Sequence, residues 1–200
     1  MPSSTRRLSP EERRAQLVRI GVDFLAERPL DELTIDALAS AAGVSRALVF
    51  HYFDSRPGMH AVIVTTARDA LLRATEPDAT LPPRERVRDV LHRFVHFVRE
   101  HEGTFYSLVR GVASADTAVR GVVADTRAAN AQRLADVYLE LGEVDTPLLQ
   151  VALRSWVAFA EEALVELVID TDTRAAEIVA FLERSLDGVV AATDTDRSLR

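Results

Sequence analysis

Three groups of residues in this 200-residue chain have the types and spacing found at catalytic or metal sites. The run Gly43-Val44-Ser45-Arg46-Ala47 has the spacing of a nucleophile elbow, but that elbow requires a preceding strand and a surrounding sheet, which the flanking sequence does not predict. His92 and His96 stand four residues apart, as metal-binding histidines on a helix do. They fall on the polar edge of a predicted helix, which favours solvated side chains.

The third group is acidic and comprises Glu161, Glu162 and Glu166. These residues share a predicted helix with many apolar side chains, which favours a polar flank or part of a ligand pocket over acid–base catalysis. The chain contains no Cys, which excludes disulfides, Cys-ligated zinc and thiolate nucleophiles. We therefore predict no catalytic residue, no metal site and no cofactor, and we expect a protein that is not an enzyme.

A different kind of chemistry is indicated by residues 34–53, which have the layout of a helix-turn-helix. Thr34 can cap a short helix, Gly43 supplies the turn that follows, and Ser45 can cap a second short helix. The second helix of such a motif presents its N-terminal side chains to base edges while its far side packs on a scaffold. Arg46 carries the only charge on the outward face, and Arg reads guanine edges through two hydrogen bonds.

Helices must position this motif, because helical periodicity and helix caps recur along the chain and no segment has the alternating pattern of a strand. We predict an all-α fold of about nine helices, with a three-helix N-terminal domain that contains the helix-turn-helix and a helical C-terminal domain. Gly103 is expected to end the helix predicted at 84–101 and to separate it from the next helix. The residues after Ala192 are expected to fray. The predicted helices span 10–28, 34–42, 45–53, 58–75, 84–101, 104–113, 117–142, 147–169 and 173–191.

The charge is distributed unevenly along the chain. Residues 1–60 contain eight Arg and eight acidic residues, so the formal net charge of −7 falls entirely on residues 61–200. The first nineteen residues have a net charge of +3, which fits an N-terminal module that touches a polyanion on an otherwise acidic body. Apolar runs are far shorter than the ~20 residues of a membrane span, and residues 1–30 lack a signal peptide, so we expect a cytoplasmic protein without a membrane partner.

The stretch from Leu33 to Arg56 resembles the DNA-binding signature of TetR-type transcriptional regulators. The resemblance covers residues 11–71, and over residues 72–200 only the order and length of the helices match. It implies a homodimer that represses transcription from a palindromic operator in double-stranded DNA. It also implies that a small-molecule effector releases the protein when it enters the C-terminal domain, which binds the effector and forms the dimer.

The resemblance also assigns roles within the motif. It implies that the side chains facing the major groove are Arg46, Ala47, Leu48 and His51. It implies that the side chains contacting phosphate are Thr34, Ser45, Tyr52 and Arg56. Phe50 of the second helix completes the predicted DNA contacts. Three positions depart from the family pattern. Leu48 stands where a smaller or polar residue is usual, Pro57 is atypical after the basic residue, and Phe50 replaces a Tyr whose hydroxyl could bond phosphate.

The middle of the chain supplies candidate effector contacts. Aromatic residues at helical spacing belong to a core more often than to a pocket, so both interpretations stay open, and the resemblance favours a pocket between the middle helices. Few charges fall on the apolar faces, which indicates a mainly apolar effector. The candidate ligand-binding residues are Phe94, Phe97, Val98, Phe105, Tyr106, Val109, Trp156 and Phe159.

Two alternative functions remain. The first is an enzyme built on a helical bundle, and the second is a protein-interaction module in which the helix-turn-helix is only a structural corner. Sequence-specific, salt-sensitive binding to DNA would distinguish the predicted regulator from both.

Overall fold

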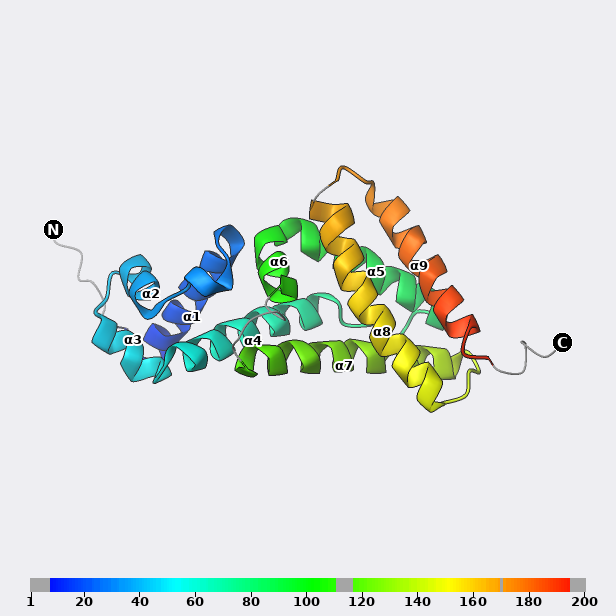
Figure 1. Ribbon diagram of the computed structural model, residues 1–200, viewed down its shortest axis with the longest axis horizontal. Helices are drawn as coiled ribbons and strands as arrows, with labels where there is room; N and C mark the ends of the chain where they lie inside the picture. Colours follow the sequence, from blue (N-terminus) through cyan, green and yellow to red (C-terminus); the bar gives the residue numbers. More distant parts are fainter. Residues whose placement is uncertain (1–7, 111–116, 170, 195–200) are drawn as a thin grey trace.

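The computed structural model describes residues 8–110, 117–169 and 171–194. These segments contain nine α-helices and no strand, which confirms the predicted all-α fold. The molecule is elongated, with the N-terminal helices at one end and the last two helices toward the other (Figure 1).

The first helix, α1 (Pro10–Glu27), begins at the predicted capping box. The Oγ of Ser9 accepts a hydrogen bond from the N–H of Glu12 at 3.2 Å, and the Glu12 carboxylate accepts one from the N–H of Ser9 at 2.8 Å. Each side chain satisfies a backbone donor that the helix itself leaves unpaired. The helix start is therefore determined by residues within one turn of each other.

Three further helices pack with α1 into an N-terminal unit. A 3₁₀ turn (Leu30–Glu32) leads to α2 (Ile35–Ala42), and α3 (Arg46–Phe53) follows after a short turn. One face of each helix enters a shared apolar core, while the opposite face of α3 stays in solvent. The most buried members of this core are Leu17, Leu25, Leu33, Leu38, Val49, Met59, Ile63 and Val119.

Two long helices connect the N-terminal unit to the rest of the molecule. α4 (Arg56–Ala74) lies against α7 (Thr117–Glu140) along the length of the protein (Figure 1). α4 begins two residues before the predicted start because the Oγ of Ser55 accepts from the N–H of Gly58 at 3.1 Å. Pro57 fits in this first turn, where its missing N–H leaves no hydrogen bond unmade.

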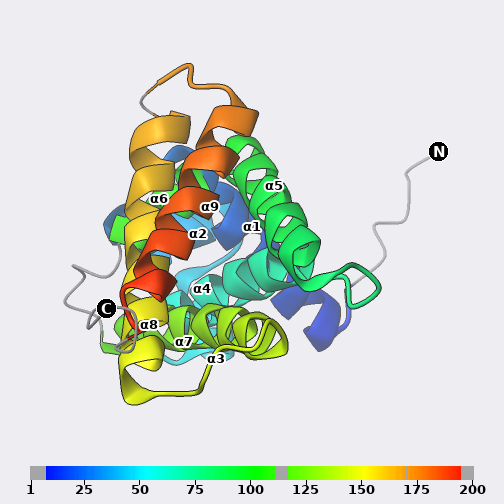
Figure 2. The ribbon, with the colours of Figure 1, turned by 90° about the vertical axis from the view of Figure 1, so that its right-hand side faces the viewer.

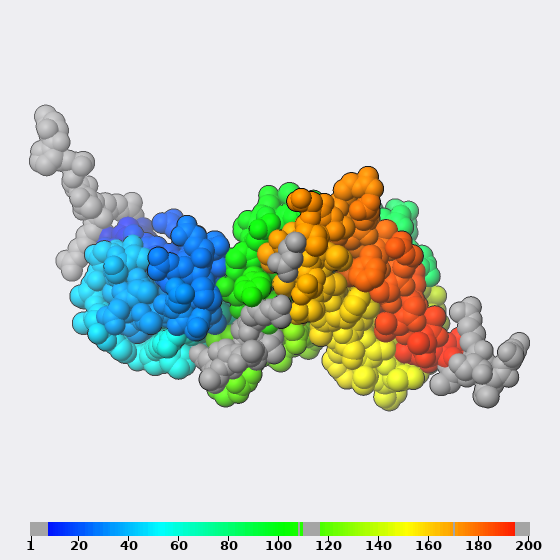
Figure 3. Space-filling model, turned by 45° about the horizontal axis from the view of Figure 1, so that its top comes forward, coloured from blue at the N-terminus to red at the C-terminus, as the bar shows by residue number. Residues whose placement is uncertain are grey.

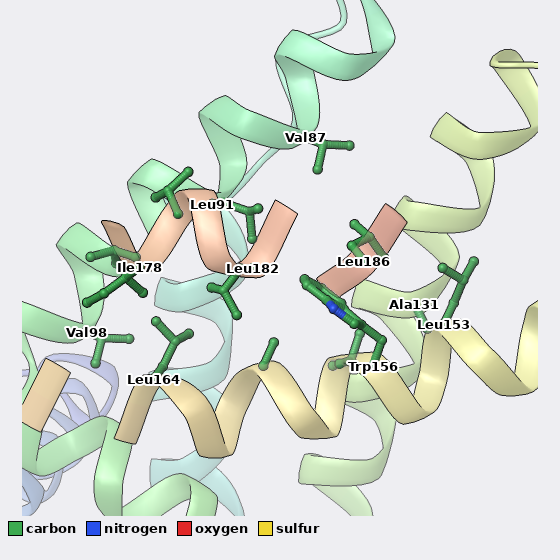
Figure 4. Close-up of a cluster of buried hydrophobic side chains, with 14 of the residues drawn as sticks. Val87, Leu91, Val98, Ala131, Leu153, Trp156, Leu164, Ile178, Leu182 and Leu186 are labelled. Atoms are coloured by element: carbon green, nitrogen blue, oxygen red, sulfur yellow. The ribbon is translucent and has the colours of Figure 1, made fainter. Parts of the chain in front are cut away.

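The C-terminal part is a bundle around a second core. Its other helices are α5 (Pro83–Glu100), α6 (Glu102–Arg110), α8 (Pro147–Leu164) with a π-helical turn (Val165–Ile169), and α9 (Ala175–Ala191). Figure 2 shows α5, α8 and α9 at the end of the molecule, and Figure 4 shows their core side chains pointing toward one another. None of the helices in the described segments is both long and apolar enough to span a membrane.

Gly103 does not separate the two helices as predicted, because it is the second residue of α6. The residue between α5 and α6 is His101. A Cβ atom on Gly103 would lie 2.0 Å from the backbone oxygen of Ala26, so the absent side chain lets α6 approach the end of α1 closely. Figure 3 shows the N-terminal unit, in blue, beside the green segment that contains α6. The predicted end of the sixth helix at 111–113, the loop at 114–116 and the tail at 195–200 lie outside the described residues.

Candidate nucleic-acid interface and ligand cavities

The turn between α2 and α3 has the geometry that the sequence predicts. Gly43 adopts a left-handed conformation with φ of 63°, which only glycine adopts without strain, and it ends α2. The N–H of Val44 then donates to the oxygen of Ala39 at 3.0 Å. Val49 and Phe53 are buried beneath α3, which places the opposite face of that helix outward.

Six of the nine predicted DNA contacts lie on α3. Arg46, Ala47, Phe50 and His51 are exposed, and Phe50 retains 42% of its accessible surface despite being a large apolar side chain. Leu48 and Tyr52 are half-buried at the sides of the helix. The outward face of α3 thus combines one cation, Arg46, with one apolar ring, Phe50.

Two of the predicted phosphate contacts cap helices. The Oγ1 of Thr34 accepts from the N–H of Ala37 at 3.0 Å, and the Oγ of Ser45 accepts from the N–H of Leu48 at 3.2 Å. A hydroxyl that accepts one hydrogen bond keeps its own proton for donation. Both side chains can therefore cap and still donate to a phosphate at a helix N-terminus, where the helix dipole favours an anion.

The two predicted arginine contacts already have partners that the sequence does not reveal. The Nε of Arg46 lies 3.0 Å from a carboxylate oxygen of Asp36 in the first turn of α2, and Arg56 donates to the backbone oxygen of Asp31. Exposed ion pairs contribute only about 0–1 kcal/mol. Base edges can therefore replace Asp36 as the partner of Arg46 at small cost.

We expect Arg46→Ala to lose base discrimination rather than general attraction to DNA. Specific affinity should fall by about 1–3 kcal/mol, the discrimination that a bidentate Arg–guanine pair provides. Fluorescence anisotropy with operator and random duplexes would measure both affinities. Arg28→Ala is a matched control, because Arg28 lies at the end of α1 that meets α6. Equal losses on both duplexes would show that Arg46 contacts phosphate instead.

We expect Phe50→Tyr to strengthen binding to specific and random DNA alike. The added hydroxyl can donate to a phosphate oxygen, a contact worth roughly 0.5–1.5 kcal/mol that does not read sequence. Phe50 is exposed, so the hydroxyl reaches solvent in the free protein and Tm should not change. A lower Tm without any gain on random DNA would place Phe50 in the core.

A first cavity, here called the apolar cavity, lies between α4, α5, α7 and α8. Its volume is about 60 Å³, several times the roughly 10–15 Å³ that one water molecule requires. Its wall comprises Thr75, Pro77, Arg86, Val87, Val90, Leu91, Phe94, Asn130, Arg133, Leu134, Val137, Trp156, Val157 and Ala160. The indole N–H of Trp156 donates to the Oγ of Ser185 at 2.9 Å, so this polar atom is already satisfied.

A second, smaller cavity of about 30 Å³, here called the Glu161 cavity, lies closer to the N-terminal unit. Val64 and Leu71 of α4, Phe105 of α6 and Glu161 of α8 contribute to its wall. The ring of Phe105 contacts the ring of Phe94 edge to face, with centroids 5.6 Å apart. Phe94 lines the apolar cavity and Phe105 lines the Glu161 cavity, so the two cavities share this aromatic contact.

The predicted ligand-binding residues therefore divide into three groups. Phe94 and Trp156 line the apolar cavity, and Phe105 and Val109 line the Glu161 cavity. Phe97 and Val98 are buried and line neither cavity, because they face the packed side of α5. Tyr106 and Phe159 each keep 43% of their surface exposed and line neither cavity, because their faces of α6 and α8 point outward.

The acidic triplet is also divided by the fold. Glu161 is buried and receives hydrogen bonds from Arg127, with Nη2–Oε2 and Nε–Oε2 distances of 2.6 and 2.7 Å. Burial raises the pKa of Glu161, and Arg127 partly offsets that rise. Glu166 is exposed. The triplet therefore does not act as one cluster.

The two histidines singled out in the sequence lie on the solvent side of α5. His92 and His96 are both exposed, and His96 lies 3.3 Å from the carboxylate of Glu100. Within the described segments, no three His, Asp or Glu side chains gather as a metal site would require.

An exposed recognition helix on a helix-turn-helix scaffold, joined by α4 to a bundle with cavities, defines a DNA-binding transcription regulator. Comparison with known proteins gives the same class. The model for bacterial regulatory proteins of the tetR family matches residues 19–61, and the model for the tetracyclin repressor-like C-terminal domain matches residues 83–187. The chain belongs to the TetR family of transcription regulators.

Solved structures of that family have the same fold. A TetR-family regulator from Streptomyces coelicolor is 30% identical, with 94% of this chain and 86% of that chain covered and a TM-score of 0.78. A TetR-like regulator from Rhodococcus sp. RHA1 is 25% identical, with 94% and 100% covered and a TM-score of 0.72. The HTH-type transcriptional activator FasR of Mycolicibacterium smegmatis is 27% identical over 105 residues, which are 52% of this chain and 48% of that protein. The match thus spans about half the length of that curated relative.

Proposed function

We propose that this protein is a ligand-responsive repressor that binds a palindromic operator as a homodimer and is released by a small, mainly apolar effector. Residues 11–71 form the DNA-binding domain in this proposal, and residues 72–200 hold the effector site and the dimer interface. One observation carries this proposal. The helix α4 starts directly after the recognition helix α3, and Leu71 of α4 lines the Glu161 cavity. Thr75, the residue that follows α4, lines the apolar cavity. A ligand in the Glu161 cavity thus touches the helix that follows the DNA-reading helix, and a ligand in the apolar cavity touches the residue that caps its C-terminal end.

The DNA contacts proposed for the motif are those predicted from the sequence, and the exposed face of α3 supports them. The effector contacts are revised to residues that line a cavity, so Phe94, Phe105, Val109 and Trp156 remain while Phe97, Val98, Tyr106 and Phe159 are withdrawn. The apolar walls of both cavities support an effector whose bulk is apolar.

The proposal is tested by the DNA that the protein retains from its own genome. Fragments should share a palindrome and should include DNA beside the protein's own gene, with affinity that falls steeply as salt increases. Retention of fragments without a common sequence would contradict a specific regulator and favour the interaction module. Transcription in vitro from a retained promoter then decides between repression and activation. This test is needed because the relative FasR is named an activator. A rise in transcript would overturn the repressor assignment.

The exposed face of α8 and α9 supports the dimer. Leu148, Val151, Phe159 and Phe181 are large apolar side chains that each keep between 39% and 51% of their surface exposed. The rings of Phe159 and Phe181 contact each other with centroids 5.8 Å apart, which joins both helices in one apolar patch. Pairing this face with a symmetry mate would form a four-helix bundle.

We therefore expect Phe159→Glu to convert a dimer into a monomer at micromolar concentration, because each copy would bury a carboxylate against its mate. Sedimentation velocity would measure the change. Phe50→Glu is the matched control, since Phe50 is equally exposed but lies on α3. It should remain dimeric while losing DNA affinity. A wild-type monomer with and without DNA would contradict the dimer.

A further inference from the structure

Two arginines are the only charged residues in the wall of the apolar cavity, whose other polar residues are Thr75 and Asn130. Arg86 enters it from α5 and Arg133 from α7. Both are attached to the connection between α4 and α5, since Arg86 donates to the oxygen of Leu81 at 3.2 Å and Arg133 to that of Thr75 at 3.3 Å. Both guanidinium groups are therefore tied to the connection between α4 and α5.

Arg86 is only partly satisfied by the protein. Its side chain is 12% exposed, its Nη1 donates to Glu140 at 2.8 Å, and that hydrogen bond raises its pKa, which keeps the guanidinium charged. Its Nε is buried and has no hydrogen-bond partner within the described segments. An unmet buried donor on a charged group is costly, so a ligand that supplied an acceptor there would gain the full value of the contact.

Arg133 is also paired at the end of α4. Its Nη1 and Nη2 both donate to the oxygen of Leu72 at 3.2 Å, and Nη2 lies 2.5 Å from the carboxylate of Glu76. The carboxylates of Glu76 and Glu140 are 68% and 48% exposed. The neutralising charges thus lie toward solvent, whereas the wall of the cavity itself contains two cations and no carboxylate.

We propose that the effector is a small monocarboxylic acid with an apolar body, whose carboxylate binds Arg86 with Arg133 beside it. The apolar body would lie against Val87, Leu91, Phe94 and Trp156. This inference rests on the proposed function, because it specifies the chemistry of the effector. A primary amine is disfavoured by the two cations, and the one carboxylate of the neighbouring cavity, Glu161, is already paired with Arg127.

The same contacts explain how such a ligand would be sensed. Arg133 holds the backbone oxygens of Leu72 and Thr75 at the end of α4. Those hydrogen bonds already have a charged donor, and a carboxylate adds an ionised acceptor that can take two parallel hydrogen bonds from one guanidinium. A bound carboxylate therefore competes with these backbone oxygens for Arg133. This competition loosens the C-terminal end of α4, the helix that follows α3.

The test compares acids with their neutral isosteres in direct binding to the full chain. Isovalerate, hexanoate and benzoate are titrated beside isovaleramide, hexanamide and benzamide, with binding followed by calorimetry in the absence of DNA. We expect at least one acid to bind at least about tenfold more tightly than its amide, because only the acid offers the guanidinium an ionised acceptor. Equal affinities for every pair, or no binding by any acid at millimolar concentration, would overturn the proposal.

Three variants assign that preference to its residue. Arg86→Met should remove the preference for the acid, while Arg84→Met should keep it, because Arg84 pairs with Asp187 outside the apolar cavity. Glu140→Gln should strengthen acid binding several-fold, since it frees Nη1 of Arg86 and removes a competing charge. Glu140 is half exposed, so this variant keeps the test valid if Arg86→Met does not fold. A preference that survives in Arg86→Met, or that weakens in Glu140→Gln, would contradict the assignment.

Operator binding is measured separately with the same acids. An acid that binds and releases the operator supports both the inference and the proposed function. An acid that binds through Arg86 without releasing DNA would support the site but contradict its role as the effector site. Release by a compound without an acidic group would leave the regulator intact and overturn the carboxylate inference.

Discussion

Arg127→Met is expected to lower the free energy of unfolding by about 3–5 kcal/mol, the usual loss when one partner of a buried ion pair is removed. The variant leaves the carboxylate of Glu161, which is 7% exposed, without its cation inside the bundle. Urea denaturation at neutral pH would measure the loss. Arg174→Met should change the midpoint little, because Arg174 pairs with Glu177 at the surface.

The loss should depend on pH in a defined direction. Burial already raises the pKa of Glu161 in the folded protein above the ordinary value of 4.5, and removing Arg127 raises it further. The folded state then binds the proton more tightly than the unfolded chain, so stability decreases as pH rises through the folded pKa. The variant should therefore regain part of the lost free energy of unfolding as pH falls toward 4.5. A deficit that is constant across this range would contradict a buried carboxylate as its cause.

The double variant Arg127→Met/Glu161→Leu distinguishes charge from packing. Replacing a whole buried ion pair with apolar residues is often neutral or stabilising. We expect the double variant to be more stable than Arg127→Met alone at neutral pH and to lose the pH dependence. A double variant as unstable as the single one would show that Arg127 acts through the packing of its side chain.

Gly103→Ala is expected to lower the free energy of unfolding by about 3 kcal/mol, at the upper end of the range for overpacking. The added Cβ would lie 2.0 Å from the backbone oxygen and 2.6 Å from the backbone carbon of Ala26. Backbone atoms cannot turn aside as a flexible side chain does, so α1 and α6 must separate. Thermal denaturation would show the loss, and operator affinity should fall because α1 supports the DNA-binding unit.

Gly121→Ala is the matched control for this prediction. Gly121 lies within α7, and a Cβ there would meet nothing within 4 Å. Alanine should stabilise that helix by up to about 1 kcal/mol, since glycine in a helix interior costs that much. If both variants were equally stable, the close contact between α1 and α6 would not be a constraint.

Signals within a few residues of each other are sufficient to predict much of this protein. The caps at Ser9, Thr34 and Ser45 form as expected because a cap joins a side chain to a backbone N–H within one turn. Gly43 ends α2 because its left-handed conformation is a local requirement. These local features, with helical periodicity, were enough for the all-α fold, the helix-turn-helix and the family.

Contacts between distant parts of the chain could not be predicted in this way. Arg127 and Glu161 lie on different helices, as do Arg86 and Arg133, and no spacing in the sequence indicates that they meet. Such pairs depend on how each helix is rotated about its axis and where it crosses its neighbours. Side chains from the whole chain decide both together, because a bundle must bury all of its apolar faces at once.

The candidate effector residues show the same limit. Helical periodicity indicates which residues are apolar on one face, but it does not distinguish a wall of a cavity from a packed core or from an interface. Trp156 and Phe159 lie one turn apart on α8, yet Trp156 lines the apolar cavity and Phe159 faces outward beside Phe181. Only the packing of α8 against α5, α7 and α9 separates them, because a cavity is the space that neighbouring helices fail to fill.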